Sequence, residues 1–193
     1  MQLNATTKLR RFFFPLLAGA CLPLSFSPVG FFPLAVLSVA FLFFLWLHAA
    51  PRQAFFTGYF FGLGFFGLGV SWVAVSFYRF GGMGLALSVA ATLLFVLFLA
   101  LFPALLGWLA RRYFSALNNA LYLLLLLPAL WVLFEWVRGW ILTGFPWLNL
   151  GYSQTDSPLI GLAPIIGVYG VSWAVAFSAG LLLCIVKSHG QKR

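Results

Sequence analysis

Apolar residues fill most of the chain in six long stretches, which are separated by prolines, paired glycines, arginines or polar turns. A helix needs roughly 20 mostly apolar residues to cross a bilayer, so stretches near that length favour membrane-spanning helices. They cover about 12–26, 32–48, 54–78, 85–110, 120–140 and 160–186, and the longest polar stretch, 143–158, lies between the last two. The pattern predicts an all-α integral membrane protein, with one polytopic transmembrane domain over residues 1–193.

The composition agrees with a membrane setting. The chain is 64% hydrophobic and 7% charged, with a mean hydropathy of +1.07, whereas about a quarter of a soluble domain is charged. We expect no soluble domain within these residues. The net charge of +9 is explained by contact with anionic lipid more simply than by nucleic-acid binding, because no basic run is interleaved with aromatic residues as a nucleic-acid surface requires.

The basic residues predict the orientation, because Lys and Arg near helix ends stay preferentially on the cytoplasmic side. If both termini are cytoplasmic, Arg79 and Arg138 are the exceptions among the 11 Lys and Arg residues. The others then fall inside: Lys8, Arg10, Arg11, Arg52, Arg111, Arg112, Lys187, Lys192 and Arg193. This asymmetry predicts that the polar stretch 143–158 faces outward.

Glycines recur along one face of the third stretch. Gly58, Gly62 and Gly69 are spaced by four and then seven residues, and small residues at such intervals let a neighbouring helix backbone approach closely. The simpler interpretation is helix packing. The alternative is a groove that admits a lipid chain.

Both acidic residues of the chain, Glu135 and Asp156, lie in its chemically richest segment, 135–156. Glu135 and Arg138 are three residues apart and share a helical face, so they can pair near the membrane. A rise of 1.5 Å per residue from Ala120 places Arg138 roughly 27 Å across the bilayer, near its outer interface. Two interpretations stay open: a salt bridge that fixes the fifth helix, or direct contact of both side chains with a substrate headgroup.

The loop that follows combines one restrained position with two permissive ones. Pro146 restricts the backbone, while Gly144 and Gly151 permit unusual dihedral angles, which together indicate a defined re-entrant turn. Trp147, after Phe145 and Pro146, is either an interfacial aromatic or part of a substrate gate. With Tyr152, these side chains make up the predicted lipid-headgroup site: Glu135, Arg138, Trp147 and Tyr152.

These residues resemble one family, the bacterial apolipoprotein N-acyltransferases, and the resemblance covers essentially the whole chain. Its most specific part is Glu135 to Asp156. The other matching segments are Gly161-Leu162-Ala163-Pro164-Ile165-Ile166-Gly167-Val168, Gly19-Ala20-Cys21 with Phe26-Ser27-Pro28, Gly69-Val70-Ser71-Trp72-Val73 and Phe80-Gly81-Gly82.

The resemblance implies an enzyme of the bacterial inner membrane, and we expect no cofactor. The two isolated cysteines, Cys21 and Cys184, have no His, Asp or Glu directly beside them in the sequence and predict no metal site. A thiolate takes an acyl chain from a phospholipid, and the chain then passes to the α-amino group of the diacylglyceryl cysteine that begins an apolipoprotein. In the family a Glu, a Lys and a Cys perform this chemistry in a nitrilase-like domain.

That triad cannot be assembled from these 193 residues. The lysines lie at predicted cytoplasmic ends and the cysteines within apolar helices, so neither type can meet Glu135 at the outer face. We therefore expect no catalytic residue here and no activity of this chain alone. The alternative from another class is a noncatalytic membrane scaffold or a small transporter. Transporters often carry inverted repeats and polar residues at the membrane midplane, and the sequence shows neither.

Overall fold

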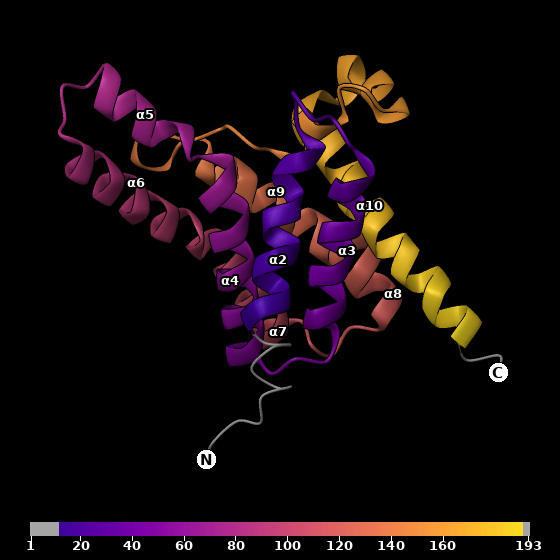
Figure 1. The fold of residues 1–193 in the computed structure, drawn as a ribbon. Coiled ribbons are helices and arrows are strands. Elements are labelled where there is room, and N and C mark those ends of the chain that lie inside the picture. Colours follow the sequence, from indigo (N-terminus) through magenta and orange to yellow (C-terminus); the bar gives the residue numbers. More distant parts are fainter. Residues whose placement is uncertain (1–11, 191–193) are drawn as a thin grey trace.

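The computed structural model describes residues 12–190, and all regular structure in that range is helical. The α-helices are α2 (Phe14–Cys21), α3 (Pro33–Leu47), α4 (Pro51–Gly69), α5 (Trp72–Arg79), α6 (Leu85–Leu99), α7 (Leu101–Tyr113), α8 (Asn119–Leu121), α9 (Leu127–Arg138) and α10 (Ala163–Gly190). Short helical turns join them: η2 (Leu22–Ser25), η3 (Tyr122–Leu126), η4 (Ile141–Thr143), η5 (Leu150–Gln154) and η6 (Pro158–Leu162). Figure 1 shows most helices gathered in one bundle, from which α5 and α6 extend together to one side as an arm.

Three helical segments of the described chain are long and apolar enough to cross a membrane: Leu85–Tyr113, Asn119–Arg138 and Pro158–His189. The pair α4 and α5 makes a fourth if its two parts, bent by 48° to one another, are one span. Two shorter apolar helical segments, Phe14–Ser25 and Pro33–Leu47, complete the bundle. The apolar helices make this a multi-pass membrane protein by length and composition, while the number of six spans stays a prediction.

The helices break where the sequence removes helical hydrogen bonds or weakens helix propensity. Where one element was expected over 54–78, the structure has α4 and α5, and Gly67 and Gly69 precede the break because glycine is a poor helix former. Pro103 has no amide hydrogen for the Leu99 carbonyl, and α6 ends at that residue. The π-helical turn η3 similarly lies just before Pro128.

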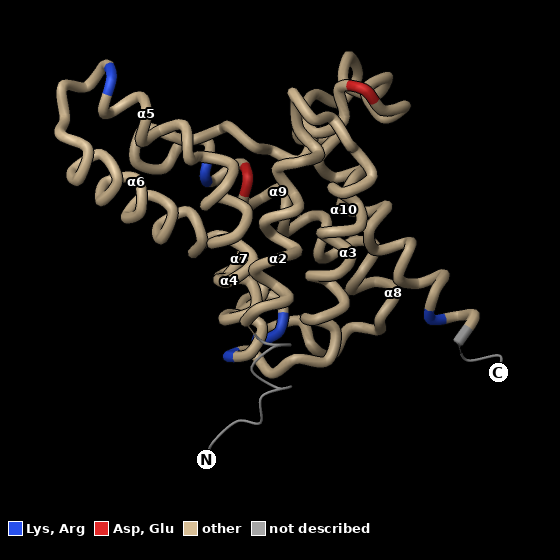
Figure 2. Tube along the Cα trace, in the orientation of Figure 1, with Lys and Arg blue, Asp and Glu red and all other residues tan. Residues whose placement is uncertain are grey.

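Most charged positions lie toward the two ends of the bundle, while Glu135 and Arg138 lie between them at the end of α9. In Figure 2 the basic positions at the start of α4, the end of α7 and the end of α10 lie toward one end, hereafter the basic end, which carries Arg52, Arg111, Arg112 and Lys187. Arg79 ends α5 at the opposite end, together with the connections that contain η4, η5 and η6, hereafter the loop end. The other predicted cytoplasmic residues, Lys8, Arg10, Arg11, Lys192 and Arg193, lie outside the described residues.

Helix α4 packs against α7 on one side and α2 on the other. A Cβ added to Gly58 would overlap the Pro103 carbonyl of α7, and one added to Gly62 would lie 2.7 Å from the Cα of Ala100. On the other side, Gly64 lies against the backbone of α2 at Leu16. At Gly58 and Gly62 the glycine face therefore holds the α7 backbone, as the packing interpretation requires, and leaves no room there for a lipid chain.

The close contact of α4 with α7 predicts a position-dependent effect of adding one methyl group. Gly62→Ala is expected to lower the free energy of unfolding by about 1–3 kcal/mol, the usual cost of overfilling a packed interface. The matched control is Gly67→Ala on the same helix, where no atom lies within 4 Å of the added Cβ. It should leave stability unchanged or slightly raised, because alanine favours helix. Reversible unfolding of both variants in detergent measures the difference, and equal stability of the two would contradict this packing.

Candidate functional site

Glu135 joins α9 to the loop that follows it. Its side chain is only 5% exposed. Oε1 accepts hydrogen bonds from Nε1 of Trp131 at 2.9 Å and from the backbone amide of Leu150 at 2.7 Å. Oε2 is buried and has no hydrogen-bond partner. Glu135 thus links the first residue of η5, Leu150, to Trp131, which lies one turn earlier on α9.

Arg138 lies in the same buried region, at the end of α9, and is 3% exposed. Its Nη2 donates to Oδ1 of Asn149 at 2.6 Å, and its guanidinium carbon lies 5.2 Å from the centre of the Phe66 ring. Nη1 of Arg138 and Nδ2 of Asn149 are both buried without a partner. A cation is therefore held inside the bundle with hydrogen-bonding capacity to spare.

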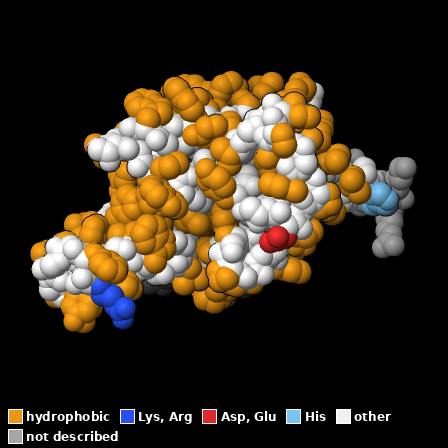
Figure 3. Space-filling view, turned by 90° about the horizontal axis from the view of Figure 1, so that it is seen from above, with side chains coloured by type: hydrophobic (Ala, Val, Ile, Leu, Met, Phe, Trp, Pro, Cys, Tyr) orange, Lys and Arg blue, Asp and Glu red, His pale blue; other side chains and the backbone are white. Residues whose placement is uncertain are grey.

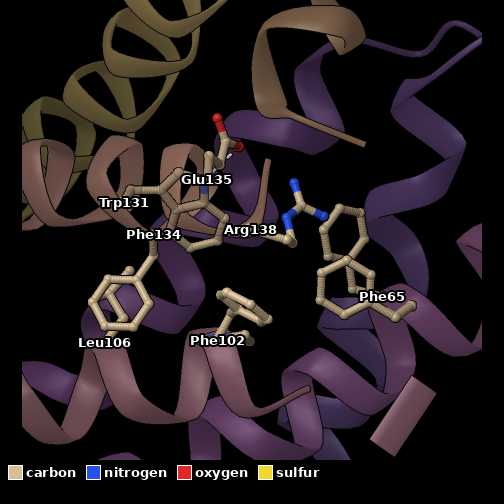
Figure 4. A pocket seen from close by; sticks show the side chains of 9 residues that line it. Phe65, Phe102, Leu106, Trp131, Phe134, Glu135 and Arg138 are labelled. Carbon is tan, nitrogen blue, oxygen red and sulfur yellow. Dashed lines mark hydrogen bonds between the residues drawn. The ribbon is translucent and has the colours of Figure 1, made fainter. Parts of the chain in front are cut away.

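Glu135 and Arg138 do not form the salt bridge that their spacing allowed. Within the described part of the chain, the hydrogen bonds of Glu135 go to Trp131 and Leu150, and that of Arg138 goes to Asn149. Figure 4 shows the carboxyl group and the guanidinium group leaving α9 in different directions. Each side chain instead binds one of two consecutive loop residues, so together they fix the point where the loop returns to the bundle.

The loop between α9 and η5 is sharply folded. The amide of Phe145 donates to the carbonyl of Arg138 at 2.8 Å, which closes the first turn. Gly144 has φ +85°, and a Cβ there would overlap the carbonyl of Gly139. Leu142, Thr143 and Leu148 also have positive φ, of 50°, 77° and 64°. Such conformations are costly for residues with side chains, and they concentrate at functional sites.

Buried polar side chains continue the attachment of the loop beyond Asn149. The amide of Gly151 donates to Oγ of Ser172 at 2.8 Å, which ties η5 to α10. Gln154 donates to Oγ of Ser153 at 2.7 Å and accepts from Oγ of Ser157 at 2.7 Å. Sequence reasoning did not assign these residues a role. For Ser172 one signal was present, since a polar residue inside an apolar membrane helix commonly has a specific partner.

Trp147 and Tyr152 lie apart from this buried group, on the surface of the loop end. They are 54% and 47% exposed and line a hollow of about 550 Å³. The rest of its lining is Phe26, Ser27, Pro146 and Leu148. Figure 3, which looks onto the loop end, shows largely apolar and uncharged side chains there. Of the four predicted site residues, two are thus buried supports of the loop and two are exposed beside the hollow.

Arg138 also lines two cavities. The smaller, of about 30 Å³, lies among aromatic and aliphatic side chains of α4, α7 and α9 and also borders Glu135 (Figure 4). The larger, of about 260 Å³, lies between α6 and the loop. Its lining residues are Phe95, Phe98, Leu99, Arg138, Ile141, Leu142, Thr143, Gly144 and Phe145.

Comparison with known proteins gives one consistent result. Residues 18–181 match a family model described as the apolipoprotein N-acyltransferase N-terminal domain. A relative named apolipoprotein N-acyltransferase from Methylococcus capsulatus is 49% identical over 168 residues, which cover 87% of this chain and 33% of the relative. Relatives of the same name from Coxiella burnetii and Vibrio cholerae are 48% and 45% identical, covering 90% and 85% of this chain and 36% and 32% of their own lengths. The chain therefore spans about a third of the length of the curated relatives it matches.

Proposed function

Because this chain belongs to the apolipoprotein N-acyltransferase family, in the N-terminal part of that family's sequence, we propose that its 193 residues form the membrane part of such an enzyme. The enzyme transfers a fatty acyl chain from a membrane phospholipid to the N-terminal diacylglyceryl cysteine of an apolipoprotein. The matching residues 18–181 and the multi-pass helical fold support this assignment. The reaction itself rests on the family and not on a catalytic centre among the described residues.

In this proposal the groups that perform the transfer, a Glu, a Lys and a Cys, lie outside the segment that this chain matches. The chain covers 33% of the Methylococcus capsulatus relative, which leaves room for them. The sequence places Lys187 at the basic end and Glu135 at the base of the loop, so these two cannot act on one substrate. The 193-residue chain alone is accordingly inactive in this proposal. Its part is to hold lipid substrates in the membrane for groups elsewhere in the enzyme.

We orient the chain with the basic end in the cytoplasm and the loop end outward, in the bacterial inner membrane, with six spans and both termini inside. Arg52, Arg111, Arg112 and Lys187 then meet the cytoplasmic leaflet. No acidic residue other than Glu135 and Asp156 exists in the chain to neutralise them. Anionic lipid headgroups supply that charge.

The substrate-holding surface in this proposal is the hollow at the loop end. Trp147 and Tyr152 offer exposed, amphipathic rings at the depth of the lipid headgroups, the usual place of such residues in membrane proteins. Glu135 and Arg138 hold the loop from behind through Leu150 and Asn149. The single observation that carries the assignment is this loop, whose segment lies within the matching residues and is fixed at both ends by buried hydrogen bonds.

An acyl-transfer assay tests the proposed function. Two proteins are compared: the purified 193-residue chain, and a chimera in which residues 18–181 replace the aligned part of the Methylococcus capsulatus relative. With phospholipid and a diacylglyceryl-cysteine peptide, the chimera should form the N-acylated peptide and the chain alone should form none. A folded chimera without activity, or an active isolated chain, would contradict the proposal.

A further inference from the structure

The segment Gly69-Val70-Ser71-Trp72-Val73 carries part of the family resemblance and has no role in the function proposed above. It lies where α4 ends and α5 begins, at the bend of 48° between the two helices. Val70 and Val73 are buried, whereas Trp72 is 47% exposed. The two valines therefore anchor the base of the arm in the bundle and leave the Trp72 ring at the surface.

Two consecutive residues of the loop after α9 contact this segment. In Figure 1 the loop, in orange, reaches the arm beside α5. The Trp147 ring lies 6.4 Å from the Trp72 ring between centroids, with 57° between the ring planes. A Cβ added to Gly69 would lie 2.5 Å from Cδ1 of Leu148. The Leu148 side chain thus occupies the space that a larger residue at position 69 would need.

The second helix of the arm contacts the same loop. Phe95 of α6 packs edge-on against Phe145, with ring centroids 4.9 Å apart. Phe145 in turn lies 5.2 Å from the Trp147 ring between centroids. Aromatic rings attract one another at such distances and angles. Trp147 is therefore flanked by Trp72 of α5 and by Phe145, which α6 holds in place.

The loop does not favour this conformation by itself. Leu148 has φ +64°, in a region that is uncommon for residues with a side chain and persists only where the surroundings hold it. Trp147, the residue before it, is 54% exposed, so its own burial does not fix its position. The contacts of Leu148 with Gly69 and of Trp147 with Trp72 supply what the loop lacks.

We propose that Gly69 and Trp72, at the base of the arm, position the Trp147 ring beside the hollow. The inference rests on the substrate-holding role of Trp147 proposed above and names the residues through which the bundle places that ring. Both tryptophan rings are largely exposed, so their contact buries little surface and adds little to stability. A misplaced ring, in contrast, changes how a substrate lies in the hollow. Changes at Gly69 or Trp72 should therefore slow acyl transfer without unfolding the protein.

Circular dichroism of the 193-residue chain in detergent tests the geometry without any activity. Two tilted indole rings in contact couple their electronic transitions and give a couplet in the far ultraviolet, which a difference spectrum isolates. Trp72→Phe and Trp147→Phe should each remove this couplet. Trp173→Phe is the control, because the ring beside Trp173 is Phe177, and it should remove none. A couplet that survives Trp72→Phe would overturn the pairing of the two rings.

Gly69→Ala tests the second contact by the same measurement. The added methyl group displaces the Leu148 side chain, so the neighbouring Trp147 ring should move and the couplet should weaken. Gly67→Ala is the matched control on α4, since its added Cβ meets no atom within 4 Å, and the couplet should persist. An unchanged couplet in Gly69→Ala would remove Gly69 from the proposal.

Acyl transfer by the chimera tests the consequence. Trp72→Ala should slow the transfer about threefold to tenfold, because the Trp147 ring is misplaced. Trp72→Phe keeps a ring at this position and should restore most of the rate. Tyr78→Ala removes an exposed ring near the other end of α5 and should leave the rate unchanged. All three variants should keep the unfolding midpoint of the unmodified chimera.

A double variant shows whether Trp72 acts through Trp147. In a chimera that already carries Trp147→Ala, Trp72→Ala should slow the transfer by less than about twofold further, because coupled residues are not additive. Normal transfer by Trp72→Ala alone, or full additive loss in the double variant, would overturn the proposal. An inactive unmodified chimera would refute the proposed function instead, and the couplet of the 193-residue chain would still decide the pairing of the rings.

Discussion

Replacing Glu135 by alanine is expected to lower the free energy of unfolding by about 2–6 kcal/mol, because it leaves two buried hydrogen-bond donors unsatisfied at about 1–3 kcal/mol each. Oε1 of Glu135 accepts from both Trp131 and Leu150, so the variant removes the acceptor of two buried donors. The variant also leaves Arg138 without a nearby acidic group. Reversible unfolding in detergent, with unfolded fraction followed against denaturant, measures the loss.

Two controls show that burial and hydrogen bonding cause the effect. Glu135→Gln keeps an oxygen at the position of Oε1 and should lose only about 1–2 kcal/mol. Asp156→Ala removes the other acidic residue of the chain, which is exposed, and should change stability by less than about 0.5 kcal/mol. If Glu135→Ala were as stable as Asp156→Ala, Glu135 would not support the loop in the way the structure indicates.

The helical class of the fold followed from the sequence because apolar stretches of near-spanning length leave few alternatives in a bilayer. The interruptions were harder to predict. The bend after α4 and the end of α6 at Leu99 depend on one or two residues each, Gly69 and Pro103. Glycine and proline also occur inside membrane helices without ending them, so hydropathy alone could not place these breaks.

The candidate site was predictable as a segment but not as a geometry. Spacing on a helix correctly put Glu135 and Arg138 close together, yet helical periodicity says nothing about what a returning loop offers them. In place of the salt bridge, which was one of the two interpretations left open, Glu135 binds the backbone amide of Leu150 and Arg138 binds the side chain of Asn149. Likewise, the hydrogen bond from the Gly151 amide to Ser172 of α10 forms only through tertiary packing. No local sequence pattern predicts it.

The second large effect is expected from replacing Trp147, and it concerns the rate of acyl transfer instead of the stability of the fold. Its exposed ring lies in the hollow, 5.2 Å from the Phe145 ring and 6.4 Å from the Trp72 ring, measured between centroids. If this surface holds the lipid substrate for the transfer, loss of the ring misplaces the substrate, and small misplacements can cost up to about a hundredfold in rate. We expect Trp147→Ala to slow the transfer about tenfold or more.

The measurement that tests the central claim most directly is therefore the rate of acyl transfer by the chimera carrying Trp147→Ala. Trp108→Ala is the matched control, since it removes a tryptophan from α7 near the basic end, away from the hollow. The account predicts a rate reduced tenfold or more for Trp147→Ala, a rate near that of the unmodified chimera for Trp108→Ala, and the same unfolding midpoint for both. Unchanged transfer by a normally folded Trp147→Ala chimera would contradict a substrate-holding role for the loop end.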